Sequence, residues 1–170
     1  MQHNSAALFL LIFFVSTSFA QTHERWDIKT LTDNQTINTT PKVVSVSQVG
    51  KVTKIKVRNA TPRMKHEHNT ITLKGVVSRI ALETDGDYHI EVKQSGSDST
   101  VACEAVDPTN TITATSPFIN DFKTVRSKAK TLKVGSHVTI TGVMFQDKYH
   151  NPSPNRTRNF VEIHPILKIE

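Results

Sequence analysis

The chain has 170 residues but only one cysteine, Cys103, which excludes the small proteins that are held together by a disulfide framework. It also has no paired cysteines and no HExxH spacing, so the common zinc motifs are missing. The HEH sequence at 66–68 has the wrong spacing for such a site. Because Cys103 lies in the apolar run VACEAV, we expect its thiol to be buried and unreactive.

Motifs of nucleophilic catalysis and of phosphate binding are also absent. The sequence contains no GxSxG motif and no glycine-rich phosphate loop. Aromatic residues are few, and only seven lie beyond residue 20. Proteins that bind single-stranded nucleic acid stack the bases on aromatic side chains, so this scarcity weighs against nucleic acid as the ligand.

Only one long apolar run is present, at residues 6–15, and it is about half of the roughly 20 residues that a membrane-spanning helix needs. The run has no polar residues at helical spacing, which argues against an amphipathic or buried first helix. Polar residues follow it, and then Ser18-Phe19-Ala20, which resembles a signal-peptidase site. We therefore predict a signal peptide at 1–20, an exported chain that is periplasmic or secreted, and no transmembrane segment after signal removal.

The formal net charge of +6 arises entirely beyond residue 20. A basic balance favours polyanionic partners such as nucleic acid, acidic glycans or a membrane surface, although a merely soluble basic surface has the same composition. The 150 residues beyond the signal are enough for one domain with a core of its own.

Alternating apolar residues predict three strands in the first half of a domain at 70–170. ITLKGVVSRIAL at 71–82 predicts a long strand, and its phase slip near Ser78 indicates a bulge. Asp85-Gly86 predicts a hairpin turn, after which YHIEVKQ at 88–94 alternates strictly. TVACEAVD at 100–107 predicts the third strand.

A helix and two further strands follow. Ser116-Pro117 predicts a helix start, and one apolar stripe continues at helical spacing through Phe118, Phe122, Val125, Ala129 and Leu132. HVTITGVMF at 137–145 and NFVEIHPILKI at 159–169 predict the last two strands.

The order of three strands, one helix and two strands predicts a mainly β fold, a five-stranded OB-like Greek-key barrel. A small sandwich with a packed helix is the alternative fold. We interpret residues 21–69 as an N-terminal extension and linker that either covers a barrel edge or adds a hairpin to it. In OB barrels two loops flank the ligand, and here they correspond to 83–87 and 146–158.

Four motifs occur in this order: a DGDYHI hairpin at 85–90, an acidic strand ending in DP at 104–108, an SPF helix start at 116–118 and an HPIL strand at 164–167. In these features the chain resembles uncharacterised bacterial exported proteins with an OB-like domain. The resemblance spans roughly residues 73–170. It implies an OB-like fold and export, and it assigns no activity or catalytic residue.

One candidate site combines histidines and carboxylates. Asp87, His89 and Glu91 share one face of their strand, and Glu104 could lie beside them on the next. A divalent metal held by His89, Glu104 and His164 could activate water for hydrolysis. The alternatives are a solvated charged strand face and, for His164, a structural histidine.

A second candidate site is the loop at 146–158. If the loop is extended, Arg156 and Arg158 point the same way and offer two guanidinium groups to an anion, with Asp147 and His150 orienting them. The alternative is that the two arginines pair with Asp147 and Glu162 and fasten the loop.

The leading hypothesis is therefore an exported binding module that holds an anionic small molecule or an envelope protein between its two loops. Nucleic acid is a less favoured ligand. The alternatives are a metal-dependent hydrolase and a structural subunit of an envelope complex. No cofactor is indicated apart from the candidate divalent metal, and the sequence favours a binding protein over an enzyme.

Overall fold

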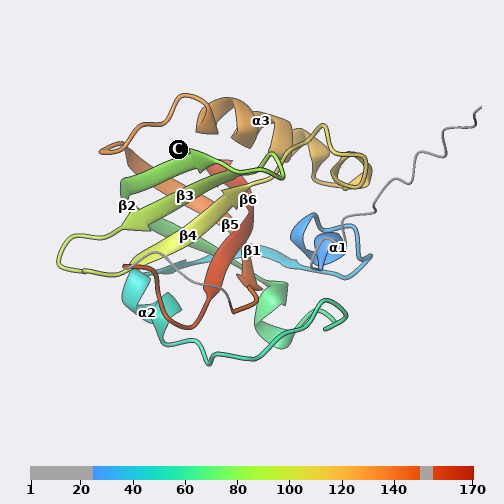
Figure 1. Cartoon of the computed structure of the whole chain (residues 1–170), viewed down its shortest axis with the longest axis horizontal. Coiled ribbons are helices and arrows are strands. Elements are labelled where there is room, and N and C mark those ends of the chain that lie inside the picture. The colour runs from blue at the N-terminus through green and yellow to red at the C-terminus, as the bar shows by residue number, and fades with distance from the viewer. Residues whose placement is uncertain (1–24, 150–154) are drawn as a thin grey trace, which may run out of the picture.

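The computed structural model describes residues 25–149 and 155–170, so the predicted signal peptide at 1–20 lies outside the described residues. One sheet contains the strands of this part of the chain (Figure 1). They are β1 (Asn38–Val44), β2 (Asn69–Leu82), β3 (Tyr88–Lys93), β4 (Thr100–Ala105), β5 (His137–Gln146) and β6 (Val161–Ile169). The helices are α1 (Trp26–Lys29), α2 (Val46–Gly50) and α3 (Ile119–Ala129), with short 3-10 helices η1 (Lys65–His68) and η2 (Thr113–Thr115).

The sheet closes into a barrel. Its strand order is β1-β2-β3-β4-β6-β5, and β5 also pairs with β2, from Thr70 opposite Val143 to Val76 opposite His137. β4 runs parallel to β6, and the remaining neighbours of the barrel are antiparallel. With α3 between the third and fourth strands of the barrel, this is the predicted OB topology, and the sandwich alternative is wrong.

Local details of the first hairpin follow the sequence pattern. The register between β2 and β3 shifts between Val77 and Arg79, which confirms the predicted bulge. The turn at 83–87 contains Gly86 with a φ of 94°, where a Cβ atom would also lie 2.7 Å from Asp107 Oδ2. Glycine is therefore required here both by the backbone conformation and by the space. The predicted turn is confirmed.

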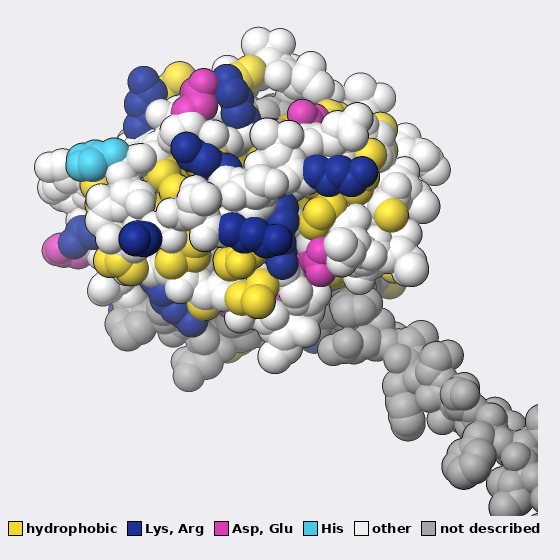
Figure 2. All heavy atoms as spheres, turned by 90° about the horizontal axis from the view of Figure 1, so that it is seen from above, with side chains coloured by type: hydrophobic (Ala, Val, Ile, Leu, Met, Phe, Trp, Pro, Cys, Tyr) yellow, Lys and Arg dark blue, Asp and Glu magenta, His cyan; other side chains and the backbone are white. Residues whose placement is uncertain are grey.

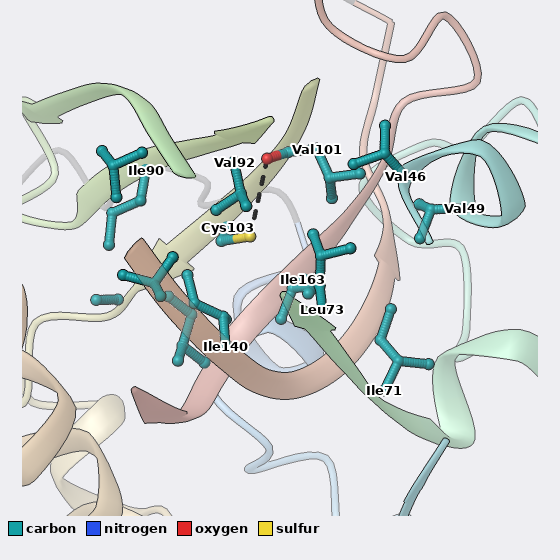
Figure 3. Close-up of a cluster of buried hydrophobic side chains, with 14 of the residues drawn as sticks. Val46, Val49, Ile71, Leu73, Ile90, Val92, Val101, Cys103, Ile140 and Ile163 are labelled. Atoms are coloured by element: carbon teal, nitrogen blue, oxygen red, sulfur yellow. Dashed lines mark hydrogen bonds between the residues drawn. The ribbon is translucent and has the colours of Figure 1, made fainter. Parts of the chain in front are cut away.

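The barrel interior is filled by aliphatic side chains from every strand of the barrel (Figure 3). Ile90 and Val92 of β3 meet Leu73 of β2 and Ile163 of β6 in this core. Cys103 is fully buried among them, and its thiol lies 3.8 Å from the carbonyl oxygen of Val101. The predicted burial of Cys103 is confirmed, and burial raises the pKa of its thiol well above the ordinary value.

Helix α3 lies above the barrel in Figure 1 and covers its upper end. Phe122, Val125 and Ala129 are buried under it, as the apolar stripe predicts. The helix itself begins at Ile119, because Ser116 and Pro117 form a preceding turn in which Ser116 Oγ accepts a hydrogen bond from the Phe118 amide. The predicted helix start is therefore early by a few residues.

The surface over α3 is basic. Figure 2 views this face and shows Lys and Arg side chains spread across it with few Asp and Glu. Lys123, Lys128, Lys130 and Lys133 are exposed here, while Arg126 lies over the Tyr88 ring at 4.3 Å. Among the described residues, no helix is long and apolar enough to cross a membrane.

The segment before the barrel is ordered against it. β1 runs parallel to β2, so this segment adds an edge strand and not a hairpin. Residues 61–69, which we interpreted as part of a linker, pack against the barrel, and Glu67 of η1 is fully buried. Its carboxylate accepts hydrogen bonds from the side chain of Arg25 and from the amide of Gln146. This network fastens the N-terminal segment to the end of β5.

Candidate functional site

A cavity of about 280 Å³ opens on the outer face of β3, β4 and β6, between the β2–β3 loop and the β5–β6 connection. Every lining residue carries an ionisable side chain, and carboxylates outnumber cations. They are Lys29, Arg79, Glu83, Asp85, Asp87, His89, Glu91, Glu104, Asp147, Arg156, Glu162 and His164. The cavity lies on the face and between the loops that bind ligands in OB barrels.

The two-residue period of the strands positions these side chains. On β3, Ile90 and Val92 enter the core, so His89 and Glu91 project from the outer face. His89 is directly opposite Glu104 of β4. By the same alternation, Ile163 of β6 enters the core while its neighbours on either side face the cavity.

The alternative of a solvated strand face is wrong. Asp87, His89 and Glu91 are only 1%, 6% and 4% exposed. Lys29 from α1 and Arg156 from the β5–β6 connection line the same cavity. Polar groups buried to this extent are expected to be paired or to bind a ligand.

His89 is the centre of the first group of side chains. Its Nδ1 atom lies 2.6 Å from Glu104 Oε1 and 3.7 Å from Glu83 Oε1. On the other side of the ring, Nε2 lies 3.5 Å from Glu91 Oε1. Glu91 is itself held by the hydroxyl of Thr100, which donates to Oε2 at 3.0 Å, and by Arg79 at 3.4 Å.

The surroundings of the first group raise the pKa values of His89 and Glu104. Burial opposes a charge on His89, but the hydrogen bond to Glu104 and the nearby Glu91 carboxylate outweigh it and raise the His89 pKa to about 10. Burial also raises the pKa of Glu104, against the opposing effect of His89. Glu104 Oε2 is buried and has no hydrogen-bond partner among the described residues. A cation could therefore replace a proton in this group and use the second carboxylate oxygen.

A second group lies on β6. Arg156 Nη2 contacts Glu162 Oε2 at 2.5 Å, and His164 Nδ1 lies 3.3 Å from Glu162 Oε1. Burial opposes ionisation of Glu162, but Arg156 and His164 outweigh it and lower the pKa to about 2. His164 Nε2 lies 3.6 Å from Asp87 Oδ2.

Asp87 and His164 are neighbours whose pKa values are shifted in opposite directions. Burial and the neighbouring Asp85 raise the Asp87 pKa to about 7, although the Asp107 amide donates to its Oδ1 at 2.7 Å. Burial lowers the pKa of His164. A buried carboxyl group with a pKa of about 7 beside a buried imidazole is the kind of arrangement that general acid–base catalysis uses.

The structure brings the predicted metal ligands His89, Glu104 and His164 into one cavity, but not around one point. Glu83, His89 and Glu104 instead offer donor atoms that all lie within 4.8 Å of one another. Glu83 was not predicted as a ligand, although it lies in the 83–87 loop that was expected to flank the binding site. Lys29 was also not predicted, because α1 brings it from a distant part of the chain and no local pattern indicates it.

The predicted anion site has a different arrangement. Arg156 is buried and lies 3.6 Å from Asp147 as well as against Glu162, which matches the alternative of a fastened loop. Arg158 is exposed and does not line the cavity that Arg156 lines, so the structure does not bring the two guanidinium groups together there. The physical reason is a turn at 158–159, which ends any extended conformation. His150 lies outside the described residues.

The chain is similar to parts of several solved proteins. Asparaginyl-tRNA synthetase of Entamoeba histolytica matches with 14% identity over 76% of this chain and 23% of its own, with a TM-score of 0.42. A putative aspartyl-tRNA synthetase of Leishmania major matches with 11% identity over 81% and 22%, with a TM-score of 0.48. An OBody bound to hen egg-white lysozyme matches with 13% identity over 64% and 94%, with a TM-score of 0.44.

This chain therefore spans less than a quarter of the length of the two synthetases. No protein-family model matches the sequence, and no curated protein matches it. The OB assignment accordingly rests on the strand order, the closure of β2 on β5 and the position of α3 in this chain.

Proposed function

We propose that the protein is a binding module whose cavity holds a divalent metal ion through Glu83, His89 and Glu104. The observation that carries this proposal is the clustering of their donor atoms within 4.8 Å, with His89 and Glu104 buried. Glu104 Oε2 supplies an additional buried oxygen without a hydrogen-bond partner among the described residues. The excess of carboxylates around these atoms favours a cation.

The donor set favours a first-row transition metal. One imidazole nitrogen and two carboxylates suit Mn²⁺, Fe²⁺ or Zn²⁺ better than Ca²⁺, which prefers oxygen ligands alone. Metal-bound histidines usually donate the N–H of their other ring nitrogen to a carboxylate. Glu91 lies beside His89 Nε2 and is placed to accept such a hydrogen bond when Nδ1 binds the metal. Three protein ligands leave coordination positions for water or a substrate.

Thermal unfolding tests the metal site. The midpoint of the metal-stripped protein should rise when Mn²⁺ or Zn²⁺ is added and fall again with chelator, because a ligand of the native state stabilises it. His89→Gln should abolish this response, whereas His164→Gln in the same cavity should keep it. An equal metal response in wild type and His89→Gln, with both proteins folded by circular dichroism, would remove the proposal.

A second candidate function is metal-dependent hydrolysis, and the Asp87–His164 pair favours it. Both side chains line the same cavity as the metal ligands. A metal held by Glu83, His89 and Glu104 would acidify a water molecule. The Asp87–His164 pair would accept the proton of this water as its oxygen adds to an ester carbonyl, and would return it to the alkoxide, which leaves as an alcohol when the ester C–O bond breaks. His164→Gln should then lose ester hydrolysis and retain metal binding. Full activity in that variant would exclude this role.

We propose in addition that the chain is exported, on the strength of residues 1–20. Cell fractionation of the expressed full chain should find a shortened protein outside the cytoplasm, and an intact cytoplasmic chain would contradict the proposal. A role as a subunit of an envelope complex predicts that a partner co-purifies with the exported protein.

A further inference from the structure

A second concave region adjoins the acidic cavity. It is a groove of about 490 Å³ lined by the segment at 54–58 and by the start of the β5–β6 connection at 147–149. Asp147 lines both the groove and the cavity, so the two regions are neighbours. Neither the metal site nor the Asp87–His164 pair uses any residue of the groove.

The groove has the opposite charge to the cavity. Lys54, Lys56, Arg58 and Lys148 line it, with Asp147 as the one carboxylate among the lining residues. The three cations of the 54–58 segment are exposed. Their combined field favours an anionic ligand.

Apolar surface lies between these charges. Ile55 and Val57 line the groove together with Tyr149, whose side chain is 71% exposed. The exposed tyrosine ring and the isoleucine form a small apolar surface inside the charged rim. The groove therefore combines a charged rim with a surface that suits an apolar or aromatic group.

Contacts within the groove hold its parts in place. Lys54 Nζ lies 4.8 Å from the centre of the Tyr149 ring and 4.6 Å from that of Phe160. The two rings meet edge to face at 5.1 Å between centres. The amide of Ile55 donates to Oε1 of the buried Gln146 at 3.2 Å, which anchors the segment to the end of β5. Because these groups are positioned in advance, a ligand would not have to order them.

We propose that this groove binds an organic anion in which a carboxylate, sulfate or phosphate adjoins an aromatic or apolar body. The acidic group would pair with Lys54, Lys56 and Arg58, and the body would pack against Tyr149 and Ile55. This inference is independent of the metal site. The proposed anion site therefore differs from the predicted one at Arg156 and Arg158. Its cations come from the segment at 54–58, which belongs to the predicted N-terminal extension.

Fluorescence titration with anilinonaphthalene sulfonate, an aromatic anion, tests the proposal on the chain without its predicted signal. The double variant Lys54→Gln/Lys56→Gln should weaken binding by about tenfold, since two ion pairs at an exposed site contribute about that much. The matched control is Lys123→Gln/Lys128→Gln on α3, which removes the same charge from another exposed surface and should leave binding within about twofold. Equal weakening in both variants would show general attraction to a basic protein and overturn the site.

Competition experiments test separately whether binding needs the acidic group and whether it needs the apolar body of the ligand. Phenyl phosphate and benzoate should displace the probe, and benzyl alcohol should displace it far less, because it lacks the charge. Tyr149→Ala should weaken the probe in a protein whose unfolding midpoint is unchanged. Displacement by the alcohol as effective as by the anions, or unchanged binding in Tyr149→Ala, would contradict the proposed ligand. A preference for phosphate over benzoate would identify the source as a phosphorylated compound.

Discussion

Asp87 shows most clearly how the cavity changes the chemistry of single residues. Its pKa is about 7 because burial and Asp85 disfavour the carboxylate, whereas the unfolded chain leaves the carboxyl near its ordinary value of 3.8. Between these values the folded protein holds a proton that the unfolded chain has released. The contribution of Asp87 to stability therefore falls as pH rises through this window.

The first prediction is that Asp87→Asn stabilises the protein at alkaline pH. Asparagine keeps an oxygen for the Asp107 amide and removes the unfavourable charge, so the free energy of unfolding at about pH 8.5 should increase by up to about 4 kcal/mol. Near pH 4 the two proteins should differ little. Urea unfolding at both pH values measures this, and a variant that is less stable at pH 8.5 would mean that the charged carboxylate is favoured.

The second prediction concerns the proton on His89. The raised pKa of this histidine stabilises the fold below the ordinary pKa of 6.5, and this contribution is lost as pH rises through about 10. A metal must displace the proton, so metal affinity should increase by about tenfold per pH unit between pH 6 and 8 if one proton is released. Calorimetry in buffers of different ionisation enthalpy counts the protons, and affinity that does not vary with pH would exclude His89 as a ligand.

Residue roles were only partly predictable from the sequence. The strand period identified His89 and Glu104, because cross-strand neighbours follow from alternation and hairpin register. Burial of these groups could not be predicted, since Lys29 and Arg156, which line the same cavity, arrive from α1 and from a long connection. Alternating charged residues along a strand give the same sequence pattern whether that face is exposed to water or covered by other parts of the protein.

At the scale of elements, periodicity was reliable where each strand buries one face. β2 to β6 and α3 agree with their predicted positions to within a few residues. β1 did not show this pattern, because nearly all of its side chains are exposed and it includes a proline. Its pairing with β2 comes from backbone hydrogen bonds, which leave no periodic signal.

The third prediction concerns η1, whose Glu67 joins three segments. Arg25 Nη1 donates to Glu67 Oε1 at 2.9 Å, and the amides of Gln146 and Met64 also donate to this carboxylate. Glu67→Gln leaves Arg25 buried without its counterion and should reduce the free energy of unfolding by about 3–5 kcal/mol. The exposed Lys65→Gln in the same helix should change it by less than about 0.5 kcal/mol. Urea unfolding compares the two, and similar values would show that η1 is not fastened by this carboxylate.

At the scale of the whole molecule, charge is segregated. Carboxylates gather in the cavity on one side of the barrel, whereas basic side chains are spread across the face over α3 in Figure 2 and line the groove at 54–58. The net charge of +6 averages these regions, so it pointed to a polyanion and concealed the acidic cavity. The fold class was predictable because it follows from the order of elements, while the position of the charges required the closed barrel.

The central claim is that Glu83, His89 and Glu104 hold a divalent metal ion. The measurement that tests it most directly is calorimetric titration of Mn²⁺ or Zn²⁺ into the metal-stripped protein and into His89→Gln and His164→Gln. One ion should bind per chain in wild type and in His164→Gln, and none in His89→Gln. Absence of binding to the folded wild-type protein, or equal binding to all three, would show that these three residues do not hold a metal.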